Sequence, residues 1–503
     1  MKLPKKLLAV FFEKLILFFL VASSVQAAGV LRVHPDNPRY FTDNSGRAIF
    51  LTGSHTWANL QDEDAGEDDD HIFDFDAYLQ MMVDQGHNFM RLWRWEPAKY
   101  AYDQTRYCLP HPWIRSGDTM ANDGQPKFDL EQFDQIYFNR LKERVIKAGE
   151  KGIYVSIMLF EGHCMDRAEE CWQYHPFHPE NNINNLPDAD LNGDGHANEL
   201  YSTLVPEEIK TYQEDYIKKI IDTVNEFDNI LYEIGNEIYD SDESVHWQYE
   251  MINFIKSYEN NQTKQHSVGM TQLNDGSNED LFNSPADWIS PGYTGSDDYR
   301  NNPPVAVGDK VIIADTDHLW GIGGDRIWLW KSFTRGLNAI YMDPYNLSGE
   351  YYAGSAHDQA NESLRQNMGY ALGYAKKMNL SEMEPQPDLA STGYCLANPG
   401  KEYLVYNPEA GDLTVNLAPE TGNFFIDWFD PETGDIYRGG KVNGGASRSF
   451  SQPSQIANDT VLYLKSISLS FRQLFAEWLY SERDLNNDGK VNSLDFGKMI
   501  LIE

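Results

Sequence analysis

The sequence is short of positive charge, and this shortage excludes one class of partner. Lysine and arginine number 41 against 77 aspartate and glutamate residues, which gives a net charge of −36 over 503 residues. A surface this acidic repels phosphate backbones, so we expect neither a polynucleotide substrate nor a nucleic-acid partner. The same charge suits a soluble extracellular protein, but it names no substrate.

Cysteine is also scarce. The four cysteines are Cys108, Cys164, Cys171 and Cys395. They are too few for a disulfide scaffold, and their spacing is not that of a structural zinc site. In an oxidising compartment Cys164 and Cys171 are able to pair across a loop, provided that the geometry allows it.

Long apolar segments are missing beyond the N-terminus. Residues 1–27 begin with several lysines, continue into the apolar run Leu15–Ala22 and end on Val25-Gln26-Ala27. This order is typical of a signal peptide that is cleaved near Ala27. The alternative is an uncleaved membrane anchor, but an apolar run of about eight residues falls short of the roughly 20 that span a bilayer. We therefore expect a secreted protein, extracellular or periplasmic, with no membrane span.

The residues that are present are enough for several domains. The length exceeds the roughly 150 residues of one domain, and 41% hydrophobic and 13% aromatic residues supply a core. Short β-rich apolar runs alternate with amphipathic helical stretches, which is typical of repeated βα units. Eight such runs predict an α/β fold, a (β/α)8 TIM barrel, over residues 28–380. The runs are 48–55, 88–95, 153–160, 229–237, 266–273, 287–293, 310–318 and 338–345, and the helical stretches are 75–85, 130–151, 206–226, 246–260, 324–336 and 362–378.

Two smaller parts are predicted to follow the barrel. After a linker at residues 384–387, short alternating strands between turn residues predict an all-β sandwich over 388–466. Its role is either carbohydrate recognition or packing against the barrel. Residues 467–503 are predicted to form a helical segment with a calcium loop of the EF-hand or dockerin-like kind.

The fourth β-rich run ends in residues suited to acid–base chemistry. It closes on Gly235-Asn236-Glu237, which brings an amide and a carboxylate to the end of the strand where barrels keep their active sites. This ending resembles that of clan A glycoside hydrolases, the cellulase-like barrels. The resemblance implies that Asn236 orients the sugar and that Glu237 is the acid/base residue. The alternative is that Asn236 and Glu237 merely cap the next helix.

The seventh run differs from the pattern of the clan. In clan A the nucleophile is a glutamate at the end of this strand. Here the run carries Asp315 and Asp317, which lie on the same side of a strand with period two. We predict Asp317 as the nucleophile because it lies nearer the loop, with Asp315 as the alternative. Carboxyl groups about 5 to 5.5 Å apart give retention, whereas about 6.5 to 9.5 Å admits a water molecule and gives inversion. The sequence leaves both outcomes open.

Further strand-end residues are predicted to bind substrate. Arg39-Tyr40-Phe41 and the segment Ala48–Trp57 resemble apiosidase-like secreted barrels, which also carry a small β-sandwich after the barrel. The resemblance to clan A implies that Arg91 or Arg94, together with Tyr293, supports the nucleophile. Flat indole faces suit sugar rings, although ordinary packing is the alternative for each residue. The other candidates are His55, Trp57, Trp93, Glu161, His163, Trp172 and Trp320.

A strong calcium-loop motif stands near the C-terminus. It offers oxygen ligands at the spacing of an EF-hand loop, and it resembles the dockerin calcium repeat. Dockerins carry two repeats and this sequence shows one, so a calcium-stabilised helix pair is the alternative to docking on a cohesin-type partner. The ligands are Asp484, Asn486, Asp488, Lys490 through its carbonyl, Asn492 and Asp495.

A second, partial calcium motif lies in the long loop after the third run. Asp190, Asn192 and Asp194 repeat the beginning of the motif, but Tyr201 occupies the twelfth position. We expect these three residues to bind Ca²⁺ together with a further residue, and the alternative is a turn without metal. Calcium is predicted to be structural, and no catalytic cofactor is expected.

The predicted function is that of a secreted glycoside hydrolase acting on an extracellular polysaccharide or oligosaccharide. The rival hypothesis is a non-catalytic carbohydrate-binding or adhesion protein on a degenerate barrel, because the seventh run lacks the expected glutamate. The separation of Glu237 from the two aspartates distinguishes these hypotheses, since hydrolysis needs the carboxyl groups within about 10 Å of each other.

Overall fold

A computed structural model of the 503-residue chain describes residues 29–64, 72–100, 106–293, 298–345, 359–418 and 422–466. The chain divides into two compact units, one ending at Pro385 and one beginning at Gln386. The predicted signal peptide and the predicted C-terminal calcium loop lie outside the described residues. Within the described ranges, no helix has the length and apolar character needed to cross a bilayer.

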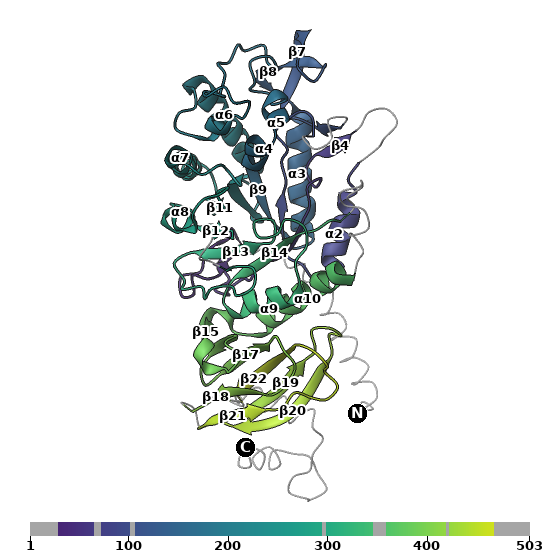
Figure 1. The fold of residues 1–503 in the computed structure, drawn as a ribbon, viewed down its shortest axis with the longest axis vertical. Coiled ribbons are helices and arrows are strands. Elements are labelled where there is room, and N and C mark those ends of the chain that lie inside the picture. The colour runs from purple at the N-terminus through teal and green to yellow at the C-terminus, as the bar shows by residue number, and fades with distance from the viewer. Residues whose placement is uncertain are drawn as a thin grey trace, which may run out of the picture. The chain divides into compact units, whose positions relative to one another are not determined.

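The first unit is built on an eight-stranded parallel sheet (Figure 1). Its order is β3-β14-β13-β12-β11-β10-β9-β5, and a parallel bridge between Thr56 and Leu92 brings the two end strands together into a nearly closed barrel. All eight predicted β-rich runs are therefore barrel strands. Their bounds are β3 (Thr52–His55), β5 (Phe89–Leu92), β9 (Tyr154–Glu161), β10 (Ile230–Asn236), β11 (Val268–Thr271), β12 (Trp288–Ser290), β13 (Val311–Asp315) and β14 (Asn338–Met342).

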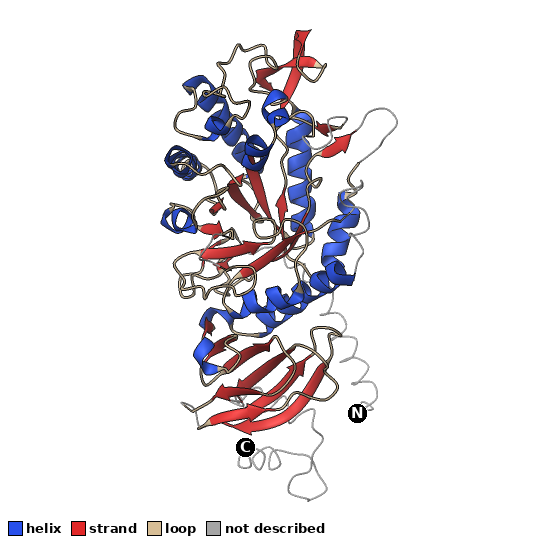
Figure 2. Ribbon diagram, viewed as in Figure 1, coloured by secondary structure: helices blue, strands red, loops and turns tan. Residues whose placement is uncertain are grey.

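Helices surround this sheet, as Figure 2 shows in blue around red strands. The six predicted helical stretches are all present, but some boundaries differ. The stretch predicted from residue 130 begins at Gln135, where Asp134 accepts a hydrogen bond from the Ile136 amide, and the stretch predicted from 246 begins after a capping box at Ser241. The helices are α2 (Phe75–Asp84), α3 (Gln135–Glu150), α4 (Gly162–Arg167), α5 (Glu169–Gln173), α6 (Glu207–Val224), α7 (Asp242–Glu259), α8 (Asn278–Asn283), α9 (Arg326–Thr334) and α10 (Gln359–Lys377), with 3₁₀ turns η1 (Asn198–Tyr201), η2 (Leu380–Glu382) and η3 (Pro387–Leu389).

Short antiparallel pairs of strands lie outside the eight-stranded sheet, and they were not predicted from the sequence. The longest is the hairpin of β7 (Trp113–Met120) and β8 (Pro126–Phe133). The end of β8, from residue 130, was predicted to be helical. The others are β1 (Arg32–Val33) with β2 (Phe41–Thr42), and β4 (Asp62–Asp64) with β6 (Tyr107–Leu109).

The interior of the barrel changes from apolar to polar along the strands. Near the strand beginnings Phe89, Leu231 and Trp288 belong to one buried apolar cluster. Gly269 makes room for the indole, because a Cβ there would lie 2.0 Å from the Trp288 ring. Side chains two residues further along a strand share its face, so the next interior positions, such as Arg91 on β5, are polar. The apolar layer closes one end of the barrel and directs polar groups to the carboxyl end of the sheet.

The second unit is a small all-β sandwich. One antiparallel sheet contains β16 (Cys395–Asn398), β17 (Glu402–Asn407), β22 (Thr460–Ser466), β19 (Asn423–Phe429) and β20 (Ile436–Asn443), and a second pairs β18 (Leu413–Asn416) with β21 (Ser447–Phe450). The two-residue β15 (Glu384–Pro385) precedes them along the chain. Val405, Phe424 and Leu462 contribute to its buried core, and on β19 buried residues alternate with exposed ones. The predicted β-sandwich is therefore present.

Candidate active site

Arg91 on β5 is the centre of a buried polar network at the carboxyl end of the barrel. Its Nε and Nη2 donate to the two carboxylate oxygens of Glu233 on β10, at 2.9 and 2.6 Å. Its Nη1 donates to Asp315 at 2.8 Å and to Asp317 at 3.2 Å. Nη2 also donates to the Asn236 amide oxygen at 2.9 Å. One guanidinium therefore joins three carboxylates from β10 and the end of β13.

Asp315 is fully enclosed by this network. Its carboxylate contacts His55 Nε2 at 2.8 Å, in addition to Arg91, and accepts the backbone amide of Asp317 at 3.0 Å. Burial raises the pKa of a carboxyl group, but His55 and Arg91 outweigh burial and hold the pKa of Asp315 well below its ordinary value. With no exposed surface and both oxygens occupied, Asp315 is an ionised supporting group.

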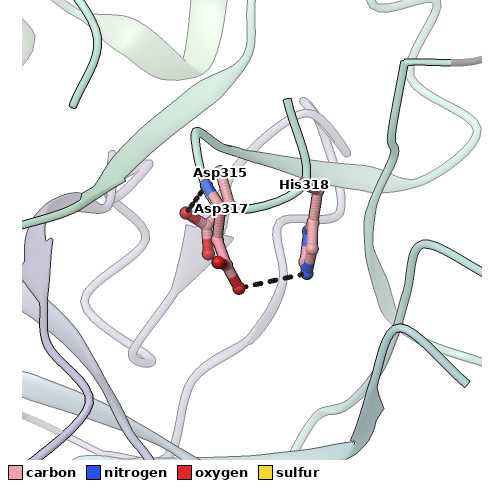
Figure 3. Close-up of side chains that lie close together, drawn as sticks. All are labelled: Asp315, Asp317 and His318. Atoms are coloured by element: carbon pink, nitrogen blue, oxygen red, sulfur yellow. Dashed lines mark hydrogen bonds and ion pairs between the residues drawn. The ribbon is translucent and has the colours of Figure 1, made fainter. Parts of the chain in front are cut away.

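Asp317 lies beside Asp315 (Figure 3) and, unlike Asp315, is partly exposed. Its side chain is 9% exposed, and its Oδ2 lies 3.2 Å from Arg91. Burial raises the pKa of Asp317 to about 7, and the neighbouring charges of Glu237 and Asp315 add to this effect against the opposing influence of Arg91. Arg91 is shared with Glu233 and Asp315, so its charge only partly offsets the effect of burial at Asp317.

His318 stands beside Asp317, with Nε2 4.0 Å from Asp317 Oδ2 (Figure 3). Its Nε2 lies 3.1 Å from the Asn236 amide oxygen and its Nδ1 2.8 Å from the Ser290 hydroxyl. Because the Asn236 oxygen is an acceptor, His318 donates from Nε2 and receives the Ser290 proton at Nδ1. Burial lowers the pKa of His318 to about 4, which agrees with a neutral ring.

Asp315, Asp317 and His318 have ligand atoms within 4.8 Å of one another, a spacing that also suits a metal ion. The cation that contacts both carboxylates is Arg91, and His318 uses both ring nitrogens for other partners. We therefore assign no metal to this cluster.

Glu237 follows β10 in a strained backbone conformation. Its φ is +44°, in the left-handed region, which costs a non-glycine residue about 1 kcal/mol or more and is concentrated at functional sites. Its carboxylate lies 2.6 Å from His163 Nδ1 and accepts a bond from the Gln272 amide at 3.4 Å. Burial opposes ionisation, but His163 outweighs it and lowers the pKa of Glu237. Burial likewise disfavours a charged His163, but contact with Glu237 raises the pKa of His163 to about 9.

His163 is positioned by the short helix α4. Glu161 at the end of β9 caps this helix by accepting the Cys164 amide at 3.0 Å, and burial raises the pKa of Glu161 to about 8. Cys164 forms a disulfide with Cys171 on α5, which confirms the predicted pair. Gly162 allows the close approach, because a Cβ there would lie 2.5 Å from the Ile238 Cα.

Above the network is an open cavity of about 420 Å³. Glu237 and Asp317 both line it, from the ends of β10 and β13, which have two strands between them, together with His163, Tyr293 and Trp320. Two carboxyl groups with pKa values shifted in opposite directions therefore meet in one cavity at the carboxyl end of a barrel.

Similar arrangements of strands and helices are found among solved structures. A structure titled "Glycoside hydrolase" is 15% identical, covers 88% of this chain and 98% of its own, and has a TM-score of 0.59. A glycoside hydrolase family 5 protein from Bacteroides vulgatus is 16% identical, with coverages of 88% and 95% and a TM-score of 0.58. The fold is one that glycoside hydrolases use.

Family models match parts of the chain. Residues 105–285 match a domain of unknown function, DUF6298, and residues 387–465 match a model described as "Putative collagen-binding domain of a collagenase". Each covers less than half of the chain. No curated protein matches.

The barrel brings most of the predicted site residues together. Lining the cavity are Glu237, Asp317, His163, Tyr293 and Trp320. Beneath it, hydrogen bonds connect Asn236, Arg91, His55, Asp315 and Glu161. Trp93 stacks on His55 with ring centroids 6.2 Å apart, and Trp57 packs edge-on against Trp93 at 6.4 Å.

Two predicted substrate-binding residues point elsewhere, and we correct their assignment. Arg94 is 1% exposed, forms an ion pair with Glu96 and lies 3.9 Å from the Tyr216 ring centroid, so it packs outside the barrel interior. Trp172 is 3% exposed and donates to Asp188 at 3.1 Å. Neither lines the cavity, because each has its partners in the surrounding packing. Of the two arginines predicted to support the nucleophile, only Arg91 contacts Asp317 and Asp315.

Several residues of the site were missed. Glu233 is the bidentate partner of Arg91, and its signal was that of a second carboxylate inside the same apolar run, four residues before Glu237. His318 directly follows Asp317, and its role was not recognised. Gln272 and Arg300 line the cavity from connecting loops without a motif.

The loop with the partial calcium motif packs beside α4. The Asp190 carboxylate accepts the amides of Gly193 and Gly195 at 2.8 and 2.9 Å, and His196 contacts the Met165 carbonyl of α4 at 3.2 Å. Glu199 lies near the aspartates: burial raises its pKa, and Asp194 and Asp190 raise it further. Its Oε2 is buried and has no hydrogen-bond partner among the described residues. Glu199 thus fits the ligand that the motif lacks.

Proposed function

We propose that this protein is a glycoside hydrolase that cleaves an extracellular polysaccharide with Glu237 and Asp317 as its reacting carboxyl groups. The observation that carries the proposal is their convergence on one cavity, with Glu237 ionised by His163 and Asp317 held near a pKa of about 7. Glycosidases of both stereochemical classes use two carboxyl groups in different protonation states.

Asp317 suits the nucleophile better than Asp315. Asp315 has no exposed surface and is occupied by His55, Arg91 and the Asp317 amide. In a double displacement the Asp317 carboxylate attacks the anomeric carbon while Glu237 protonates the departing oxygen. Glu237 then takes a proton from water, which attacks the same carbon and releases Asp317. The anomeric configuration of the first product, read by NMR, distinguishes this course from inversion.

The proton for Glu237 is held within its pair with His163. At neutral pH this pair carries one proton, placed on His163 by its pKa of about 9 and 2.6 Å from the Glu237 carboxylate. Transfer to Glu237 makes that residue the acid for the departing oxygen. His163 is therefore a positioning residue that keeps a proton beside Glu237.

This assignment predicts a bell-shaped pH dependence of kcat/KM. Activity should rise as Asp317 loses its proton through about pH 7 and fall as the pair of His163 and Glu237 loses its proton through about pH 9. The maximum is therefore expected near pH 8. If Asp317 were the acid instead, kcat/KM would fall as the pH rises through 7. A maximum below pH 7 would therefore make Asp317 the acid and Glu237 the nucleophile.

The test of the function is a panel of polysaccharides incubated with the mature protein and with a Glu237→Gln, Asp317→Asn double variant of matched folding. Release of reducing ends from one glycan by the wild type alone is the expected result. Binding of a glycan without cleavage by either protein would instead favour a carbohydrate-binding protein.

We further propose that the protein is secreted. The disulfide between Cys164 and Cys171 supports this proposal, because such bonds persist mainly in oxidising compartments. The N-terminal sequence of the protein recovered from culture medium tests it, with cleavage expected near Ala27.

A structural calcium ion is proposed for the loop beside α4, held by Asp190, Asn192 and Asp194 and completed by Glu199. These carboxylate and amide oxygens are the ligands that Ca²⁺ prefers. Removal of calcium with EGTA is expected to lower the Tm by several degrees, since a ligand at 100 times its Kd stabilises by about 2.7 kcal/mol. Glu199→Gln should abolish most of the calcium-dependent shift, and an unchanged shift would contradict this ligand set.

A further inference from the structure

The cavity that holds the two carboxyl groups also contains an unpaired cation. Arg300 lines it, and its guanidinium lies 4.4 Å from the ring centroid of Tyr293. Its Nε is buried and has no hydrogen-bond partner among the described residues. Buried guanidinium donors are nearly always paired, so a partner from outside the chain is the natural complement.

Arg300 also borders a second cavity of about 400 Å³. The two cavities share Arg300 and Trp320, so they adjoin at these side chains. Trp320 is 40% exposed and is held edge-on against Trp328, with centroids 5.6 Å apart. The exposed indole offers a flat face on which a sugar ring is able to stack. The neighbouring guanidinium offers N–H donors for a negatively charged substituent of that ring.

The other charges of the two cavities are already engaged or exposed. Arg167 donates to Asn274 at 2.7 Å and lies 3.5 Å from Asp166. Lys331 donates to the Asn301 carbonyl at 2.8 Å. Among the acids, Asp325 caps α9 by accepting the Trp328 amide at 2.7 Å. Among the described residues that line the two cavities, Arg300 is therefore the cation that makes no hydrogen bond or ion pair within the chain.

The overall charge of the chain makes a local cation necessary for any anionic substrate. A net charge of −36 repels anionic polymers at long range, so a neutral glycan would be the easier substrate unless the cleft supplied local compensation. From these contacts we infer that the substrate is an anionic polysaccharide, whose carboxylate or sulfate group binds Arg300 while its ring stacks on Trp320. The inference rests on the proposed hydrolase and names its substrate class.

The experiment measures binding and cleavage of polymers in matched charged and neutral forms. Polygalacturonate, alginate and hyaluronan are compared with their carboxyl-reduced forms, and chondroitin sulfate and carrageenan with their desulfated forms. Binding is measured by affinity electrophoresis with the Glu237→Gln protein, so that cleavage does not interfere. Carboxylate and sulfate polymers together distinguish the two sources of charge.

The expected result is tighter binding of one charged polymer than of its neutral form, and at least a tenfold weakening of that binding by Arg300→Gln. Arg32→Gln, at an exposed position, should leave binding unchanged. Equal binding of charged and neutral forms, no binding of any charged polymer, or no effect of Arg300→Gln would overturn the inference.

Cleavage separates this inference from the proposed function. If the wild type cleaves only neutral polymers and Glu237→Gln does not, the substrate class is wrong and the hydrolase stands. If Glu237→Gln cleaves a charged polymer as fast as the wild type, the catalytic assignment fails, whereas the binding data on Arg300 keep their meaning.

Discussion

Replacement of Glu237 by glutamine is expected to lower kcat/KM on the natural polysaccharide by about 10²- to 10⁴-fold, the range of general acid catalysis. The loss should depend on the leaving group. An aryl glycoside of the same sugar with a strongly acidic phenol needs no protonation to depart, so its first cleavage step should be nearly as fast in the variant as in the wild type. The burst of released phenol, measured by stopped flow, reports this step.

Asp317→Asn is the matched comparison for this prediction. It removes the attacking carboxylate, so the loss should be at least as large on the activated glycoside as on the polysaccharide. A Glu237→Gln variant that is equally inactive on both substrates, beside an Asp317→Asn variant that recovers on the activated one, would exchange the two roles. Equal activity of both variants with the wild type would refute the site.

The barrel could be predicted from the sequence because its strands are buried on both faces. A parallel strand such as β10 then appears as a continuous apolar run, and all eight runs were found for this reason. The hairpin of β7 and β8 was missed because many of its residues are exposed and it lacks such a run. Its pairing depends on contacts across the turn rather than on composition.

The reacting groups could also be predicted, since a carboxylate directly after an apolar run is conspicuous. Glu237 and Asp317 were found in this way. The partners that set their pKa values were harder, because Arg91 meets Glu233 and Asp315 across separations of 142 and 224 residues. Glu233 lies inside its strand, and no role was predicted for it. Such pairings follow from strand order and register, which the sequence pattern does not give.

Arg91→Met is expected to destabilise the protein by about 3 to 5 kcal/mol, because it leaves the buried carboxylates of Glu233 and Asp315 without their cation. Urea denaturation at pH 8 measures the loss. Arg32→Met, at an exposed position, is the control and should change stability by less than about 0.5 kcal/mol. A double variant with Glu233→Gln should recover part of the loss, since one uncompensated charge is removed.

The dependence of this loss on pH tests its electrostatic origin. In the wild type the pKa of Asp315 is depressed in the folded state, so its stabilising contribution is present above the unfolded pKa and is lost as pH falls through the folded value. Without Arg91, only His55 opposes the effect of burial, so the pKa of Asp315 rises and protonation relieves part of the penalty. The difference between wild type and Arg91→Met should therefore shrink from pH 8 to pH 5. A difference independent of pH would attribute the loss to packing around the arginine rather than to its charge.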